Sequence, residues 1–104
     1  MSINKRIKVD NLPRFDAAPY LGSEQAIAAY LTDILSANDA GLLAAALGDI
    51  ARARGMTEIA KSAGITREAL YKALRPGSEP RLDTVTRVCA ALGVRLVALP
   101  IQTP

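Results

Sequence analysis

Histidine and tryptophan are absent from this sequence of 104 residues, and cysteine occurs once, as Cys89. The lack of histidine removes the commonest general base of enzymes and the commonest metal ligand. One cysteine can form neither an intrachain disulfide nor a cysteine-rich zinc site. The carboxylates are spread out without a close pair, and no glycine run has the spacing of a phosphate-binding loop. We therefore predict a protein that is not an enzyme and that holds no metal or other cofactor.

Long apolar runs are missing as well. No stretch reaches the roughly 18 apolar residues that a membrane-spanning helix needs. No apolar run of the signal-peptide kind follows the first basic residues. These two absences favour a soluble, cytoplasmic protein.

Aromatic residues are scarce, at 4% of a chain that is 50% apolar, so alanine, leucine, isoleucine and valine must build the core. Alanine is the strongest helix former, and this composition therefore favours an all-α fold. The length suits one domain. We predict an N-terminal extended arm or strand at 1–14, a single domain at 15–99 and a short tail at 100–104.

The formal net charge of +3 is distributed unevenly along the chain. From Met56 to the end, seven basic residues stand against four acidic ones, and the first ten residues carry three bases and one acid. Residues 15–51 contain five acids and no base: Asp16, Glu24, Asp33, Asp39 and Asp49. An acidic middle between basic ends favours two partners of opposite charge, with ordinary solvated helix faces as the alternative explanation.

Apolar residues recur at helical spacing in several segments. Ser23 and Asp39 precede two of these segments and are good N-caps, and Gly55 is placed to end the second helix. A further helix is expected near 82–92, with Cys89 on its apolar stripe as a small core residue. Together with the two short helices described below, this predicts about five helices.

Both ends of the chain show apolar patterns of a different kind. Residues 3–9 alternate almost regularly between apolar and polar side chains, and residues 94–99 are mostly apolar and rich in valine and leucine. Each segment therefore predicts a minor terminal β-strand. Because a two-stranded ribbon alone is only marginally stable, the two strands pair either with each other or across a dimer.

The segment 57–74 is the most informative part of the sequence. It predicts two short helices, which begin after the N-caps Thr57 and Thr66 and are separated by a turn at Gly64. Glycine suits that turn because it adopts a positive φ without strain, and Ala60 is small enough for two helices to cross closely. The wedge between the helices and the core is expected to contain Ile59, Ile65 and Leu70. The pattern is typical of a helix-turn-helix unit, although an ordinary helical bundle uses small residues in the same way.

Under the first interpretation, the second helix of this unit reads the major groove of DNA. Arginine can bind guanine through two hydrogen bonds, and glutamate can accept one from cytosine. The start of the first helix would meet a phosphate. The expected DNA-binding residues are Thr57, Thr66, Arg67, Glu68, Tyr71, Lys72, Arg75, Ser78 and Arg81. Packing against the scaffold is the alternative role of Tyr71, and a solvated surface position is the alternative for Lys72, Arg75 and Arg81.

Residues 42–99 resemble the Xre-type, lambda-repressor-like helix-turn-helix fold. A narrower resemblance covers about residues 12–97 and rests on four stretches of the sequence. These are FDAA followed by YL within 15–21, AIAAYL at 26–31, LGDIARARGM at 47–56 and REALYKAL at 67–74. They resemble the family of probable addiction module antidote proteins, which is related to HigA-type antitoxins.

That resemblance implies the antitoxin of a bacterial toxin–antitoxin pair. Its partner would be a small basic toxin of the RelE/HigB-like type, an mRNA-cleaving ribonuclease, which the antitoxin binds and silences. The antitoxin would also repress the shared operon. Arg81 departs from the family, whose members often have a small polar cap there, so a weaker cap on the last helix is expected.

Three functions remain open on the sequence alone. The first is an antitoxin that also binds operator DNA, acting as a homodimer because such proteins read paired half-sites. The acidic segment 15–51 would then complement a basic toxin. The second is a plain Xre-type transcriptional regulator with no toxin partner. The third is a protein-interaction module that no longer touches DNA, which the absence of salt-dependent DNA binding would reveal.

Overall fold

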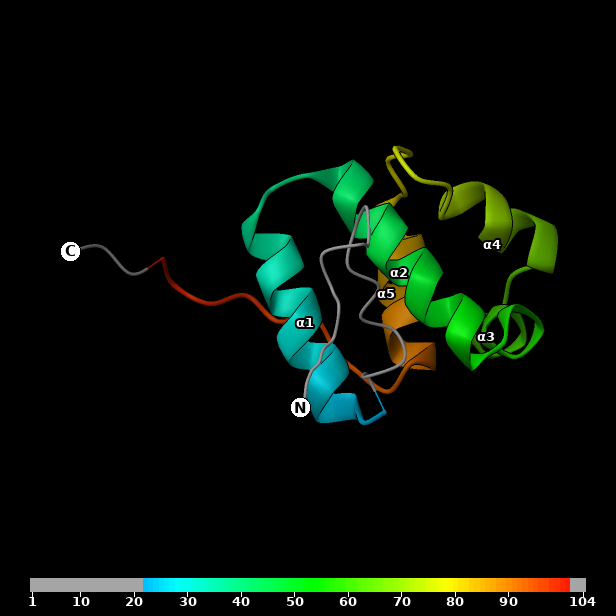
Figure 1. Ribbon diagram of the computed structural model, residues 1–104, viewed down its shortest axis with the longest axis horizontal. Helices are drawn as coiled ribbons and strands as arrows, with labels where there is room; N and C mark the ends of the chain where they lie inside the picture. Colours follow the sequence, from blue (N-terminus) through cyan, green and yellow to red (C-terminus); the bar gives the residue numbers. More distant parts are fainter. Residues whose placement is uncertain (1–21, 102–104) are drawn as a thin grey trace, which may run out of the picture.

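The computed structural model describes residues 22–101, and within that range it contains five α-helices and no strand (Figure 1). The all-α, five-helix prediction is thus confirmed. The helices are α1 (Glu24–Ser36), α2 (Ala40–Arg54), α3 (Met56–Ala63), α4 (Arg67–Ala73) and α5 (Leu82–Ala91). Figure 1 places α1 and α4 on opposite sides of the molecule, with α2 and α5 between them.

The first two helices begin at the predicted caps. The Ser23 hydroxyl accepts a hydrogen bond of 3.1 Å from the Ala26 amide, and the Asp39 carboxylate accepts one of 3.1 Å from the Leu42 amide. Each bond satisfies an amide that has no partner inside its helix. The predicted end of α2 is also confirmed, because Gly55 closes it with a φ of 108°.

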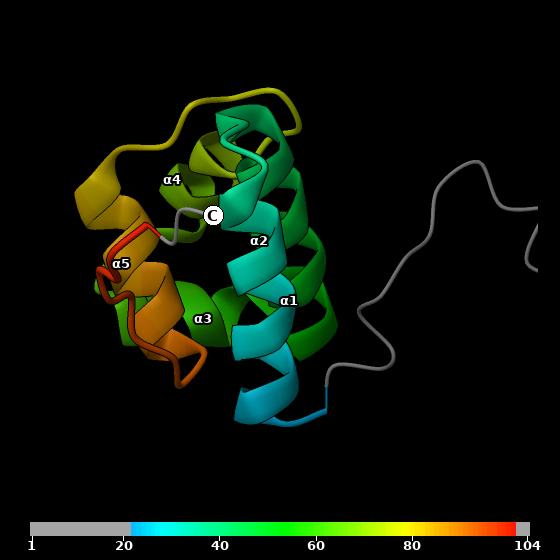
Figure 2. The same cartoon turned by 90° about the vertical axis from the view of Figure 1, so that its left-hand side faces the viewer.

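One apolar core joins all five helices. Its fully buried members include Ile27 of α1, Leu47 of α2, Leu70 of α4 and Val88 of α5, while α3 contributes Ile59. Figure 2 shows α1 and α2 side by side, and α3 contacts α2, α4 and α5. Most of the core is aliphatic, together with Met56 and Cys89, and in the described range none of its buried members is aromatic, as the scarcity of aromatic residues predicted.

Cys89 lies on the buried stripe of α5 with an exposed fraction of 1%. Burial raises the pKa of its thiol, because desolvation disfavours the thiolate. This confirms its interpretation as a core residue. Over residues 22–101, no helix is long and apolar enough to cross a membrane.

Thr57 does not cap α3, so that prediction is wrong. The helix begins one residue earlier at Met56, with Gly55 as its N-cap and no side-chain cap bond. The carbonyl of Gly55 accepts the first helical hydrogen bond, from the Ile59 amide at 3.0 Å. Met56 is buried in the core, and packing of that side chain starts the helix immediately after the turn.

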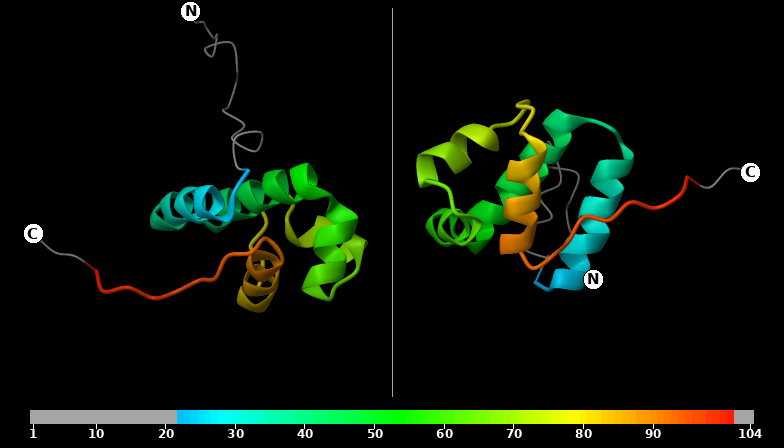
Figure 3. Two further views of the ribbon diagram at one scale, coloured as in Figure 1. Left: turned by 90° about the horizontal axis from the view of Figure 1, so that it is seen from below. Right: turned by 180° about the vertical axis from the view of Figure 1, so that it is seen from behind.

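The strand predicted at 94–99 is not formed either. The Val94 amide donates to the Cys89 carbonyl at 2.9 Å, which closes the end of α5, and the chain then continues without a ladder partner in the described range. Val94 and Leu96 pack instead against the helical core. Figure 3 shows this segment leaving α5 and running toward α1. The strand predicted at 3–9 lies outside the described residues.

Candidate nucleic-acid interface

The turn between α3 and α4 has the conformation that the sequence predicted. Gly64 ends α3 in the left-handed region, at φ 76° and ψ 29°. Its amide donates to the Lys61 carbonyl at 3.2 Å, and the Ile65 amide donates to the Ala60 carbonyl at 3.0 Å. These two bonds satisfy the last carbonyls of α3. A residue with a side chain would be strained at this φ, which explains the glycine.

The inner face of the α3–α4 unit is closely packed. Ala60 is almost completely buried, and Ile59 and Leu70 are buried with it. Ile65 is half-buried and packs against the same core. The predicted wedge is therefore confirmed, and it holds α4 against the rest of the fold.

Thr66 starts α4 as predicted. Its hydroxyl oxygen accepts a hydrogen bond of 3.0 Å from the Ala69 amide. Leu70 is the one buried residue of this seven-residue helix. Four further residues predicted to bind DNA lie on α4, and all four are exposed: Arg67, Glu68, Tyr71 and Lys72. The structure thus brings them together on one short helix, which Leu70 and, less deeply, Ala73 hold against the core.

Arg67 and Tyr71 form a pair on the outside of α4. The guanidinium carbon of Arg67 lies 5.3 Å from the centre of the Tyr71 ring, which is a cation–π distance. A guanidinium nitrogen also donates to the Tyr71 hydroxyl at 3.3 Å. Tyr71 is 39% exposed and does not belong to the core. The ring therefore lies against the arginine on the surface of α4, while DNA contact and packing against the scaffold both stay predictions for Tyr71.

The remaining predicted contacts lie outside α4, and one of them already makes a hydrogen bond within the protein. Thr57, Arg75 and Arg81 are exposed. Arg81 occupies the N-cap of α5 without a side-chain cap bond, as its departure from the family pattern predicted. Ser78 is different, because its hydroxyl donates to the Ala73 carbonyl at 2.6 Å. That bond uses the only hydrogen that the hydroxyl could offer a phosphate, so Ser78 closes the loop after α4.

Arg87 is a basic residue near the turn that the sequence did not single out. It lies on α5, where it forms a 3.8 Å ion pair with Asp83. Its guanidinium reaches to within 3.6 Å of the position that a Cβ atom on Gly64 would take. For α5, the sequence predicted only a helix with an apolar stripe that faces the core. The approach of α5 to the turn depends on tertiary packing, which no local spacing reveals.

Replacing Thr66 by alanine is expected to lower the free energy of unfolding by about 1 kcal/mol, because the Ala69 amide loses its cap. Chemical denaturation followed by helical circular dichroism measures the change. Thr57→Ala is the matched control, since Thr57 is exposed inside α3 and caps nothing. That control should shift stability by less than about 0.5 kcal/mol. Equal losses for the two variants would contradict the assignment of Thr66 as the cap.

Matches to known proteins cover most of the chain. A family model described as "Probable addiction module antidote protein" matches residues 11–100, a range that includes all five helices. A Haemophilus influenzae protein described as uncharacterized is 48% identical over 86 residues, which span 83% of this chain and 89% of that protein. No solved structure shows a significant match. The extent of the family match shows that the chain belongs to the family of probable addiction module antidote proteins.

Proposed function

We propose that this protein is the DNA-binding antitoxin of a toxin–antitoxin pair, which neutralises its toxin and represses the operon that encodes both. Membership of the antidote family implies a toxin partner in general. The DNA-binding role is supported above all by the exposed Arg67–Tyr71 pair on α4. The turn at Gly64 and the cap Thr66 place this helix at the surface.

In the proposed complex, α4 enters the major groove of operator DNA. Arg67 stands in its first turn, where recognition helices present side chains to base edges, and its guanidinium suits the two acceptors of guanine. Glu68 would accept from cytosine, and Lys72 would contact a base or a phosphate. Thr57, Arg75 and Arg81 would contact phosphates and thereby fix the register of the protein on DNA. A homodimer would read two half-sites, one helical turn or a multiple of it apart.

The toxin would be a small basic ribonuclease of the RelE/HigB-like type. A basic partner needs a complementary acidic surface, and Glu24, Asp33 and Asp39 are exposed on α1 and at the start of α2. Asp49 contributes less, because its side chain is 11% exposed and forms a 2.6 Å ion pair with Arg52. The α1 side of the molecule is therefore the proposed toxin-facing side.

Co-expression with the product of the adjacent small gene tests the antitoxin assignment. We expect the neighbour alone to stop growth, and this protein to restore growth and to co-purify with it. An Asp33→Lys variant should rescue less well if the acidic side faces the toxin, and Asp39 is left unchanged because its carboxylate caps α2. A neighbour that is harmless and does not bind would leave a plain Xre-type regulator as the function.

Replacing Arg75 by alanine is expected to weaken binding to operator and to unrelated DNA by the same factor. A phosphate contact carries no sequence information, and its loss reduces the slope of log K against log salt by about 1. Binding titrations of both DNAs over a series of salt concentrations measure this slope. A selective loss of operator binding would instead make Arg75 a base contact.

A further inference from the structure

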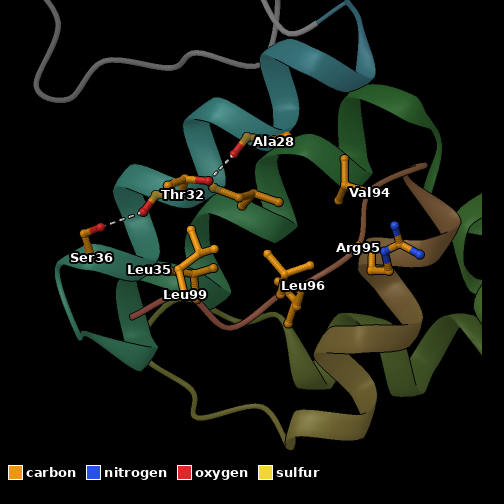
Figure 4. Close-up of a pocket in the computed structure, with 10 residues that line it drawn as sticks. Ala28, Thr32, Leu35, Ser36, Val94, Arg95, Leu96 and Leu99 are labelled. Carbon is orange, nitrogen blue, oxygen red and sulfur yellow. Dashed lines mark hydrogen bonds between the residues drawn. The ribbon is translucent and has the colours of Figure 1, made fainter. Parts of the chain in front are cut away.

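A groove runs between α1 and the C-terminal segment, on the side of the molecule away from α4. Its volume is about 270 Å³. Figure 4 shows side chains from two separate parts of the chain converging on it. One wall comes from α1 and includes Ala28, Leu31 and Leu35, and the other comes from residues 94–99 and includes Leu96 and Leu99.

The groove is apolar although α1 places two hydroxyl groups beside it. The Thr32 hydroxyl donates to the Ala28 carbonyl at 2.8 Å, and the Ser36 hydroxyl donates to the Thr32 carbonyl at 2.9 Å (Figure 4). Both donors are therefore turned back onto the helix. Arg95 is the one charged residue among those that line the groove.

Large apolar side chains are exposed along the same side. Leu35 is 41% exposed, Val97 67%, Leu99 77% and Ile101 89%. Single exposed leucines are common on protein surfaces, but a group of them beside an apolar groove marks an interaction site. The groove and these side chains together form what we call the C-terminal face.

The main chain of this face makes no backbone hydrogen bond through the amides of residues 95–99 to any part of residues 22–101. The helices therefore do not use these amides, and an extended segment of this kind is a surface to which another chain pairs. Its partner would cover apolar side chains and satisfy backbone groups at once.

We propose that a second copy of this chain occupies the C-terminal face, so that two copies dock there about a two-fold axis. A two-fold interface must be self-complementary, because each copy presents the same patch. This face meets that requirement, since the exposed apolar side chains Leu35, Val97 and Leu99 line its groove, and the same side chains of the partner copy can pack against them.

Charge favours a second copy over the basic toxin as the occupant. The charge within the groove is the positive Arg95, and the adjoining hollow, which shares Arg95 and Val97, is also lined by Glu24. The face thus carries one charge of each sign, so a basic partner gains little net attraction there, whereas two nearly neutral apolar faces meet without strong repulsion. Of the acidic residues proposed to face the toxin, Glu24 lines this hollow, while Asp33 and Asp39 line neither of the two.

Docking at the C-terminal face leaves the DNA-reading helix free. Figures 1 and 3 show residues 94–101 and α4 at opposite ends of the molecule. The dimer required for two half-sites can therefore form without covering Arg67 or Tyr71. In this respect the inference rests on the proposed function, which it completes by naming the dimer surface.

Sedimentation equilibrium of the purified full chain, without DNA or toxin, tests the proposal. We expect a dimer for the wild type and a dissociation constant raised about a hundredfold or more for Val97→Glu, because two introduced carboxylates would be buried at the contact. Leu82→Glu is the matched control, since Leu82 is 71% exposed and does not line the groove. It should remain dimeric.

Two outcomes would overturn the proposal. One is a wild type that stays monomeric at millimolar concentration, and the other is a Val97→Glu variant as dimeric as the wild type. If the wild type is monomeric and its co-purification with the toxin is lost in Val97→Glu, the face is assigned to the toxin. Circular dichroism checks that the variants are folded, and Leu99→Glu repeats the test at a second exposed position.

The failure of this dimer surface and the failure of the proposed function can be told apart. A dimer that Val97→Glu dissociates supports this surface even if neither DNA nor toxin binds. Growth rescue by a monomeric wild type would support the antitoxin assignment while overturning the surface.

Discussion

Replacing Leu70 by alanine is expected to lower the free energy of unfolding by about 2–5 kcal/mol. The side chain is 0% exposed and is the one buried residue within α4. Its removal leaves a cavity between α4 and the core, and α4 is too short to hold its helical form by propensity alone. A loss of this size is a large part of the total stability of about 5–15 kcal/mol that is usual for a domain.

Urea denaturation followed by helical circular dichroism measures this loss. Leu82→Ala is the control, because Leu82 is 71% exposed at the start of α5, and a change within about 0.5 kcal/mol is expected for it. Leu70→Met should retain most of the stability, since methionine nearly conserves the volume. A loss below about 1 kcal/mol for Leu70→Ala would mean that the core does not depend on α4.

The sequence predicted best those features that depend on one or two residues in fixed local positions. Ser23, Asp39 and Thr66 cap helices because a short polar side chain before an apolar stripe satisfies a free amide wherever it occurs. The left-handed turn at Gly64 was predictable for a similar reason, since few residues other than glycine adopt that φ easily. The same local patterns predicted which residues of α4 are exposed, and these residues make up much of the candidate DNA-binding site.

The features that the sequence missed depend on contacts between distant segments. Thr57 followed by an acidic residue has the pattern of a helix start, but burial of Met56 against the core starts α3 earlier. Residues 94–99 have the composition of a strand, but a strand also needs a neighbouring strand. In the described chain, Val94 and Leu96 instead pack onto a helical core.

The same limit applies within the site. The Ser78 hydroxyl bonds to the Ala73 carbonyl because the loop after α4 folds back, and the residue type alone does not reveal that fold. The Arg67–Tyr71 pair, in contrast, follows from a four-residue spacing on a helix, which places two side chains next to each other. The sequence named both residues without connecting them.

Replacing Arg67 by alanine is expected to weaken operator binding about 10- to 100-fold, which corresponds to about 1–3 kcal/mol. Binding to unrelated DNA should change much less, because most of that affinity comes from phosphate contacts. The sequence preference should relax at one base pair of each half-site. Arg67→Lys should rescue little, since lysine lacks the planar pair of donors that fits guanine.

Tyr71→Phe separates orientation of the arginine from contact with the base. The variant keeps the ring beneath the guanidinium and removes only the hydroxyl that accepts a hydrogen bond from Arg67 at 3.3 Å. If the ring orients the arginine, Tyr71→Phe should bind the operator nearly as well as the wild type, whereas Tyr71→Ala should approach Arg67→Ala. Titrations against the operator and a single-base-pair series measure all four variants. An equal loss of specific and non-specific binding in Arg67→Ala would show that this side chain contacts phosphate, and the base-reading role of α4 would then have to lie with Glu68 or Lys72.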